Sequence, residues 1–354
     1  MKILFVISST GIGGEQRVAS ILTDYFVKKG HLVDILTFKE GEKSFSFNND
    51  IKIKCIENKK RMFNNLNRII KIRKASKQGK YDIVIGFAII PSVLCSLANI
   101  GLKSSVVVCE RNDPSVYSKL WKFVRSIAYQ FAKGAVFQTT DAKNFFGGNY
   151  FKNSTIIHNP LELSRIPDRY LKERKKAIVN TARLTSAKNQ KLLIQAFANV
   201  HQEFEEYNLE IYGDGPLKED LLLLIRELKL DRKVKLFEAT PNVLQYIKDC
   251  EVFVLSSNNE GFPNSLAEAM AMGLPCISTN CRIGGPKEMI TNYENGILVE
   301  VNDLKAMENA LRSVLSDEKM RKNLGDNAYD LRKKLEYSHI GDIWINFLEK
   351  IKKL

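Results

Sequence analysis

Arg183-Leu-Thr-Ser-Ala-Lys188 follows a short apolar run, and Glu260-Gly-Phe-Pro-Asn-Ser-Leu-Ala-Glu268 joins a predicted loop to a predicted helix. The first stretch places two cations five residues apart, and the second places two carboxylates on either side of seven residues. Cations suit a diphosphate, and carboxylates suit hydroxyl-rich groups such as a ribose or a sugar ring. A nucleotide-sugar carries all three parts, so the two stretches together predict a nucleotide-sugar site.

Apolar, β-branched runs alternate with helical runs along the whole chain, in two series. The first series of predicted strands covers 2–8, 32–38, 51–56, 82–87, 105–109, 135–139 and 155–158, and the second covers 177–181, 209–212, 234–237, 252–256, 276–279 and 296–299. Strands without polar alternation are typical of a parallel sheet buried on both faces. Two successive βαβ series therefore predict an α/β protein with two doubly wound domains, in which ligands bind beyond the carboxyl ends of the strands.

The length of 354 residues exceeds what one core usually supports. We expect an N-terminal domain over 1–163 and a C-terminal domain over 164–336, separated by the polar stretch 164–176. The last segment, 337–354, reads as an amphipathic helix.

The loop Ser8-Ser-Thr-Gly-Ile-Gly-Gly-Glu-Gln-Arg17 follows the first predicted strand and opens the first predicted helix. Glycines let the backbone approach a phosphate, and the free N–H groups at a helix start attract negative charge. A plain strand–helix turn is the simpler alternative. A dinucleotide site is disfavoured, because the spacing is not G-x-G-x-x-G.

These three stretches, in this order and spacing, resemble the glycosyltransferases of family 4, which have the GT-B fold of two Rossmann-like domains facing a cleft. Gly13, Gly14 and Arg17 match the Gly-Gly-Ala-Glu-Arg signature of that family, with Glu15 in place of the alanine and Gln16 in place of the glutamate. The resemblance implies that the first domain binds the acceptor and the second binds the nucleotide-sugar. It also implies that the final helix crosses back to the first domain.

The resemblance assigns roles to individual residues. Arg183 and Lys188 would hold the leaving diphosphate, Glu260 would contact the transferred sugar, and these three form the expected catalytic set. The expected donor-binding residues are Gly13, Gly14, Phe262, Asn264, Ser265 and Glu268, with Glu268 on the ribose hydroxyls. The expected acceptor-binding residues near the strand ends are Arg17 and Arg111. Ser265 is also a sensible N-cap for the helix that carries Glu268.

The net charge of +14 lies wholly in the first half of the chain, where residues 1–165 hold 26 basic and 12 acidic residues. Residues 58–81 contain nine bases and no acid. On a helical wheel Met62, Phe63, Leu66, Ile69 and Ile70 share one face, and Lys60, Arg61, Arg68 and Lys71 lie roughly opposite. An ordinary surface helix is one interpretation. The other is contact with an anionic membrane surface or a lipid-linked diphosphate, so the four cations join the expected acceptor-binding residues.

Several features of the sequence bear on where the protein resides and on whether it needs a cofactor or a metal. No secretory signal is predicted after Met1, and the six cysteines lack C-x-x-C spacing, which is typical of reduced cytoplasmic residues. The apolar stretch 83–100 is interrupted by Gly86, Pro91 and Asn99, so a buried strand and helix are favoured over a membrane span. No Asp-x-Asp is present, which agrees with metal-free chemistry. We expect a cytoplasmic protein, peripheral on the inner face of the cell membrane, with no cofactor and no metal.

The favoured function is a retaining, metal-independent transfer of a hexose or N-acetylhexosamine from a UDP-sugar to a polyprenyl-diphosphate-linked glycan, in surface polysaccharide or glycoprotein glycan assembly. A nucleotide-sugar 2-epimerase of the same fold is the first alternative, although it would not need a polybasic face. A non-enzymatic membrane-binding protein would leave Glu260 and Glu268 without a role. A nicotinamide dehydrogenase would need the missing glycine motif. Nucleic acid is not expected, because no aromatic platform accompanies the bases. The oligomeric state is left open.

Overall fold

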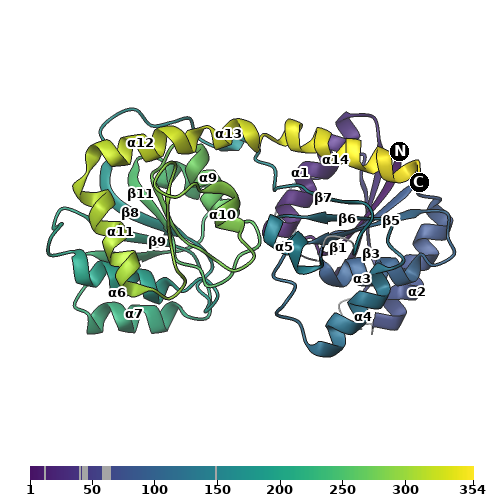
Figure 1. Cartoon of the computed structure of the whole chain (residues 1–354), viewed down its shortest axis with the longest axis horizontal. Coiled ribbons are helices and arrows are strands. Elements are labelled where there is room, and N and C mark those ends of the chain that lie inside the picture. Colours follow the sequence, from purple (N-terminus) through teal and green to yellow (C-terminus); the bar gives the residue numbers. More distant parts are fainter. Residues whose placement is uncertain (12, 40, 42–46, 58–64, 148–149) are drawn as a thin grey trace. The chain divides into compact units, whose positions relative to one another are not determined.

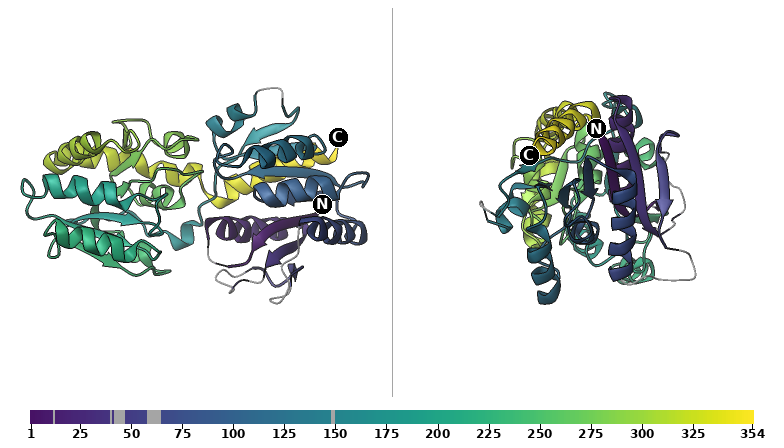
Figure 2. Two further views of the ribbon diagram at one scale, coloured as in Figure 1. Left: turned by 90° about the horizontal axis from the view of Figure 1, so that it is seen from below. Right: turned by 90° about the vertical axis from the view of Figure 1, so that its right-hand side faces the viewer.

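The computed structural model describes residues 1–354 except residues 12, 40, 42–46, 58–64 and 148–149. The chain divides into two compact units. Unit 1 comprises Met1–Pro160 and Leu335–Leu354, and unit 2 comprises Leu161–Lys334. Each unit holds one parallel β-sheet with helices on both of its faces (Figure 1, Figure 2).

The described residues of unit 1 form a seven-stranded sheet in the order β3-β2-β1-β4-β5-β6-β7. Its strands are β1 (Lys2–Ser9), β2 (Leu32–Lys39), β3 (Lys52–Cys55), β4 (Ile83–Gly86), β5 (Ser105–Glu110), β6 (Gly134–Phe137) and β7 (Ser154–Ile156). Its helices are α1 (Gly14–Lys28), α2 (Asn65–Gly79), α3 (Ile89–Ala98), α4 (Lys119–Tyr129), α5 (Thr140–Phe145) and α14 (Tyr337–Lys352).

The centre of this sheet is buried on both faces, because helices cover each side. Every residue of β4 and of β5 is buried. The apolar stretch 83–100 therefore forms a buried strand and the almost completely buried helix α3, as predicted. No helix of the described residues has the length and apolar character that a membrane span requires.

Helices α2, α3 and α4 lie on one face of the sheet, whereas α1 and α14 lie on the other (Figure 1). Gly341 of α14 lets the Tyr25 ring of α1 approach closely, since an added Cβ would lie 2.2 Å from that ring. The Tyr25 hydroxyl donates to Asp342 Oδ1 at 2.6 Å. Asp82 joins the two ends of the chain, because it accepts from the Lys2 N–H at 2.8 Å and pairs with Lys352 at 3.1 Å.

The described residues of unit 2 form a six-stranded sheet in the order β10-β9-β8-β11-β12-β13. Its strands are β8 (Lys175–Thr181), β9 (Asn208–Tyr212), β10 (Val234–Phe237), β11 (Cys250–Leu255), β12 (Cys276–Thr279) and β13 (Ile297–Val299). Its helices are α6 (Gln190–Val200), α7 (Lys218–Glu227), α8 (Val243–Ile247), α9 (Asn264–Ala271), α10 (Gly285–Met289), α11 (Leu304–Ser316), α12 (Glu318–Tyr329) and α13 (Leu331–Lys334), with the 3-10 turn η1 at Leu163–Arg165.

Both sheets reverse their strand order at one position. In unit 1 this switch point lies between β1 and β4, and in unit 2 it lies between β8 and β11. The predicted fold class, two doubly wound parallel-sheet domains, is confirmed. The carboxyl ends of the strands at a switch point diverge and leave a crevice where ligands bind in such folds. In unit 2 these ends lead into residues 182–189 and 256–263, which include the Arg183–Lys188 stretch and the start of the Glu260–Glu268 stretch.

Candidate functional site

Lys188 and Glu260 meet at the switch point of unit 2. The Lys188 Nζ lies 2.5 Å from Glu260 Oε1, and the Ser257 hydroxyl donates to the same oxygen at 2.7 Å. The lysine side chain is 21% exposed and the glutamate side chain 10%, so both retain limited access to solvent. The pair thus presents a fixed cation beside a fixed carboxylate at the ligand-binding edge of the sheet.

Hydrogen bonds between the two loops hold this pair in place. The Asn258 N–H donates to the Ala187 carbonyl at 2.8 Å, and its side-chain amide donates to the Ser186 carbonyl at 3.0 Å. The Ser256 hydroxyl donates to the Lys188 carbonyl at 3.0 Å. Ser256, Ser257 and Asn258 are not among the site residues predicted from the sequence. Their position directly after β11, beside the switch point, is the signal that could have found them.

Arg183 is exposed at the start of the first loop. The next residue, Leu184, is fully buried and its N–H donates to the Asp214 carbonyl at 2.9 Å. Gly213 permits this close approach, because a Cβ there would lie 1.9 Å from the Ala182 carbonyl oxygen. The loop backbone is therefore anchored while the Arg183 guanidinium projects into solvent, where it is available to an anion.

The second stretch forms a loop and then α9, as predicted, but Ser265 is not the N-cap. Helix α9 begins at Asn264 with Pro263 as its cap residue, and no side-chain hydrogen bond closes this end. Pro263 already holds the extended backbone conformation of a cap position, so the helix starts before Ser265. Pro263 itself therefore offers no side-chain cap to the N–H groups of the first turn. Glu268 is buried on α9, 5% exposed, and Phe262 is 6% exposed.

In unit 1, the glycine loop follows β1 and opens α1, as predicted, with residue 12 outside the described residues. Gly13 lies against Gln16, whose Oε1 would be 2.4 Å from an added Cβ, and Gly14 is the first residue of α1. Glu15 Oε1 accepts from the Ser8 N–H at 3.3 Å. Burial raises the pKa of Glu15, against the opposing effects of that N–H and of Arg111. Arg17, the third expected contact in this loop, lies in the first turn of α1.

Arg111 follows β5 at the same edge of the unit 1 sheet. Its Nη2 donates to Asn159 Oδ1 at 2.6 Å, and its guanidinium carbon lies 4.1 Å from the centroid of the Phe87 ring. Burial lowers the pKa of Arg111 to about 10, which still leaves the guanidinium charged at neutral pH. The structure therefore fixes one cation beside Glu15 at this edge, where an anionic or hydroxyl-rich ligand would meet it.

The basic segment departs from its predicted orientation. Lys60 and Arg61 lie outside the described residues. The expectation that Arg68 projects from the polar face is wrong, because its Nε lies 2.5 Å from Oε1 of the buried Glu57 and its guanidinium stacks on Phe38 at 4.8 Å. Leu66 and Ile70, from the predicted apolar face, are 63% and 56% exposed, so this part of the face does not pack on the core of the unit. Lys71 is exposed as predicted.

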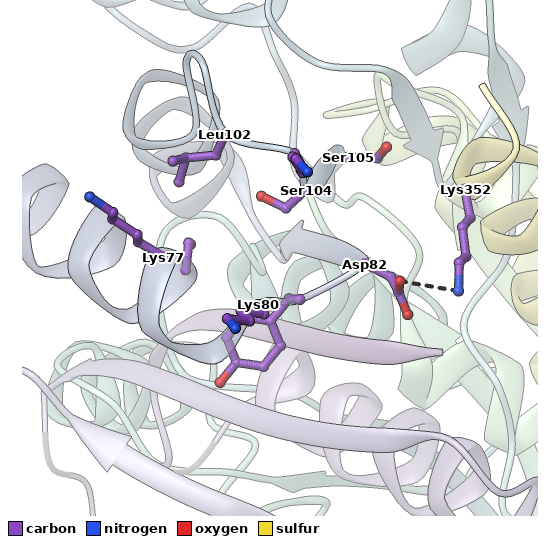
Figure 3. Close-up of a pocket in the computed structure, with 10 residues that line it drawn as sticks. Lys77, Lys80, Asp82, Leu102, Ser104, Ser105 and Lys352 are labelled. Atoms are coloured by element: carbon purple, nitrogen blue, oxygen red, sulfur yellow. Dashed lines mark ion pairs between the residues drawn. The ribbon is translucent and has the colours of Figure 1, made fainter.

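A pocket of about 620 Å³ lies at the opposite, amino-terminal edge of the unit 1 sheet (Figure 3). Its lining includes four lysines and one acid, and Asp82 points toward Lys352 with an ion pair of 3.1 Å (Figure 3). The lysines are Lys77, Lys80, Lys103 and Lys352. Because β4 and β5 begin here, this pocket is not at the ligand-binding edge of the fold.

In the described parts of the chain, no group of three or more His, Cys, Asp and Glu side chains is placed to hold a metal ion.

Residues 165–331 match the family described as "Glycosyl transferases group 1", and residues 2–110 match the family described as "Glycosyl transferase 4-like". One Campylobacter jejuni relative is 28% identical over 99% of both chains and is named GalNAc-alpha-(1->4)-GalNAc-alpha-(1->3)-diNAcBac-PP-undecaprenol alpha-1,4-N-acetyl-D-galactosaminyltransferase. A second relative from C. jejuni, N-acetylgalactosamine-N,N'-diacetylbacillosaminyl-diphospho-undecaprenol 4-alpha-N-acetylgalactosaminyltransferase, is 31% identical over 72% of each chain.

Solved structures share the whole architecture at low sequence identity. Anabaena Alr3699/HepE, crystallised with UDP, superposes with a TM-score of 0.85 at 17% identity, covering 99% of this chain and 100% of that one. The lipopolysaccharide outer core galactosyltransferase WaaB superposes with a TM-score of 0.79 at 21% identity over 100% of both chains. At these identities the likeness establishes the fold.

Proposed function

This chain belongs to the family 4 glycosyltransferases of the GT-B fold, and we propose that it transfers a hexose or N-acetylhexosamine from a UDP-sugar to a polyprenyl-diphosphate-linked glycan, with retention of configuration. Two observations about relatives support the substrates. Both C. jejuni relatives carry names that describe transfer to an undecaprenyl-diphosphate-linked glycan. The Anabaena protein was crystallised with UDP and with UDP-glucose.

The observation that carries the proposal is the Lys188–Glu260 pair at the unit 2 switch point. A diphosphate needs cations, and a sugar ring needs hydroxyl acceptors within a few ångströms of them. The lysine and the glutamate supply both at adjacent positions. Arg183, exposed in the same loop, adds a planar group with several N–H donors that suits two phosphate oxygens at once.

The proposed reaction breaks the bond between the sugar C1 and the oxygen of the UDP β-phosphate. An acceptor hydroxyl attacks C1 from the same face, and its proton passes to the departing phosphate oxygen. Charge grows on the diphosphate during this step, and Arg183, Lys188 and the first N–H groups of α9 stabilise it. Glu260 orients the sugar rather than attacking it. Glu268 binds the ribose hydroxyls of the nucleotide.

No step of this mechanism requires a metal ion, because two side-chain cations and the start of a helix meet the charge of the diphosphate. We extend the proposal accordingly to a metal-independent enzyme. Phe262, Asn264 and Ser265 would contribute backbone N–H groups to the donor.

The acceptor side of the proposal involves unit 1. Arg17 and Arg111 lie at the carboxyl edge of its sheet and would contact the acceptor glycan. Lys71 is exposed on α2 and would meet a carrier diphosphate or an anionic membrane surface. We extend the proposal to a peripheral enzyme on the cytoplasmic face of the cell membrane, in surface polysaccharide or glycoprotein glycan assembly.

Ligand-dependent melting and a transfer assay test this function together. Because bound ligand stabilises the folded state by mass action, UDP at about one hundred times its Kd would add about 2.7 kcal/mol of stability. UDP and UDP-sugars should raise the melting temperature, while GDP and NAD should not. Transfer is then measured with the stabilising UDP-sugars and a synthetic prenyl-diphosphate-linked disaccharide. Stabilisation by GDP alone, or by NAD, would contradict the donor assignment.

A further inference from the structure

Helix α4 turns its apolar stripe toward solvent. Leu120, Phe123, Ile127 and Phe131 follow one another at helical spacing and are 70%, 64%, 42% and 47% exposed. Arg125, on the other side of the helix, is only 5% exposed. A surface helix normally does the reverse and buries its apolar stripe against the core. Large apolar side chains that gather on a protein surface mark a contact with a partner or a membrane.

The inner face of α4 fixes this orientation. Arg125 Nη1 lies 3.7 Å from Glu110 Oε1 and donates to the Pro114 carbonyl at 3.1 Å. Its guanidinium carbon lies 4.8 Å from the centroid of the Phe146 ring. A rotation that buried the apolar stripe would expose Glu110 and Arg125 and break these contacts. The outward position of the stripe is therefore built into the fold.

Helix α2, on the same face of the sheet, repeats the arrangement (Figure 1). Its inner face carries the buried residues Ile72 and Ser76 together with the Arg68–Glu57 ion pair. Leu66 and Ile70 are left exposed on its outer face. We call the exposed apolar residues of the two helices, together with Phe131 in the turn just after α4, the outer surface, and they are Leu66, Ile70, Leu120, Phe123, Ile127 and Phe131.

The charges around the outer surface are positive. Between residues 58 and 140 the sequence contains only three acids, Asp82, Glu110 and Asp113. Glu110 and Asp113 are buried, and Asp82 pairs with Lys352. The exposed lysines of α2 and α4 and of the turns that follow them are Lys71, Lys74, Lys77, Lys80, Lys119 and Lys133, and Lys103 is exposed in the turn after α3.

We call the pocket lined by Lys77, Lys80, Lys103 and Lys352 the lysine pocket, and it adds positive charge at the end of α2. Lys77 and Lys80 come from the end of α2 and the turn after it (Figure 3). Lys103 comes from the loop before β5. Ser76 Oγ is buried against the pocket and has no hydrogen-bond partner among the residues that the structure describes. A donor hydroxyl and three cations suit a phosphate group.

We propose that the outer surface docks on an anionic lipid bilayer, with the α4 stripe entering the boundary between headgroups and acyl chains. The lysines then face headgroup phosphates, one of which the lysine pocket receives. An apolar stripe bordered by lysines is the composition that interfacial helices use, and each lysine near an anionic surface strengthens binding about fivefold. A symmetric contact with a second copy is disfavoured, because it would bring the lysines of two copies together. The proposal rests on the membrane association in the proposed function, but lipid binding can be measured without transfer.

Sedimentation of the full chain with vesicles tests the proposal. The probes are vesicles of phosphatidylcholine alone and vesicles containing 30% phosphatidylglycerol, the latter expected to bind at least tenfold more protein. The triple variant Leu120→Gln, Phe123→Gln, Ile127→Gln should lose at least tenfold in binding to the anionic vesicles. The matched control replaces three apolar residues that are equally exposed elsewhere, as Leu32→Gln, Leu171→Gln, Leu223→Gln, and should bind like the wild type.

A second variant separates charge from insertion. Lys103→Gln, Lys119→Gln, Lys133→Gln should weaken binding to anionic vesicles strongly and binding to neutral vesicles little, and higher salt should have the same effect on the wild type. Unchanged vesicle binding by the α4 triple variant would overturn the proposal. A second result would also overturn it. In that case sedimentation velocity shows the wild type to be a dimer, and the α4 triple variant is a monomer whose vesicle binding is unchanged. Transfer to a water-soluble, short-chain acceptor should persist in both variants. Its absence in the wild type would count against the proposed reaction and not against the lipid-binding surface.

Discussion

Lys188 and Glu260 are 72 residues apart in the chain, yet Nζ of the lysine and Oε1 of the glutamate lie 2.5 Å apart. The pair spans the switch point of unit 2, since Lys188 follows β8 and Glu260 follows β11. When a diphosphate binds beside them, the lysine gains a second anionic neighbour and the glutamate gains a repulsive one. The two residues should therefore respond differently to substitution.

Lys188→Ala should cripple transfer while the fold survives. In the proposed reaction the lysine charge acts on the leaving diphosphate, and the loss of one such electrostatic group costs on the order of a hundredfold or more in rate. The initial rate of transfer and the melting temperature measure the two effects. Lys191→Ala, an exposed lysine on the next helix, is the control and should retain the wild-type rate. A near-normal rate for Lys188→Ala would remove the lysine from the catalytic set.

Glu260→Gln should separate binding of UDP from transfer of the sugar. The amide oxygen can still accept from Ser257 and Lys188, but the negative charge beside the diphosphate is gone. UDP should bind at least as tightly as in the wild type by calorimetry. Transfer should fall on the order of a hundredfold, because the sugar is no longer oriented. Weaker UDP binding together with unchanged turnover would contradict the assigned role.

The fold followed from the sequence because the buried strands are continuous apolar runs. Residues 105–109 illustrate this, since all of β5 is buried. The Lys188–Glu260 contact was harder to predict from the sequence. Both residues were expected in one site, but their direct pairing and the Ser257 hydroxyl depend on which strands are neighbours. Pattern alone does not fix that order.

The orientation of α2 and α4 could not be read from periodicity. A helical wheel places the larger apolar side chains inward, whereas here Arg68 and Arg125 face inward. Each has a buried carboxylate to meet, Glu57 and Glu110, supplied by a different part of the chain. Places where a local pattern and the tertiary structure disagree are often functional. In this protein the disagreement coincides with the outer surface.

Transfer activity should persist in excess EDTA. The prediction rests on the two cations of the donor site and on the absence of an Asp-x-Asp motif from the sequence. The transfer rate is compared before and after chelation, and again after magnesium or manganese is added back. If the transfer rate falls on chelation and recovers when metal is added, metal independence is refuted. A bound metal ion would then neutralise the charge of the diphosphate.

Arg68→Gln and Lys71→Gln should differ sharply in stability although the two residues lie one turn apart on α2. Arg68 pairs with Glu57, which is 4% exposed, so its loss leaves a buried carboxylate without its cation. We expect a cost on the order of 2 kcal/mol or more in unfolding free energy for Arg68→Gln. Lys71 is exposed, and its replacement should change stability by less than about 0.5 kcal/mol. Denaturant titration measures both, and equal values would contradict the inward position of Arg68.

Glu110 should make stability fall as the pH rises toward neutrality. Burial raises the pKa of Glu110 to about 7, against the opposing effects of Arg125 and of the Tyr129 hydroxyl, which donates to Oε1 at 2.6 Å. An unfolded glutamate titrates near 4.3, so between about pH 4.3 and 7 the folded state binds more protons than the unfolded state. Unfolding free energy then decreases with rising pH over this window and levels off above it. Denaturant titrations from pH 5 to 8 should show this decrease, and in Glu110→Gln it should be smaller by up to about 1.4 kcal/mol per pH unit. Identical slopes in the two proteins would mean that Glu110 is ionised in the folded state throughout this range.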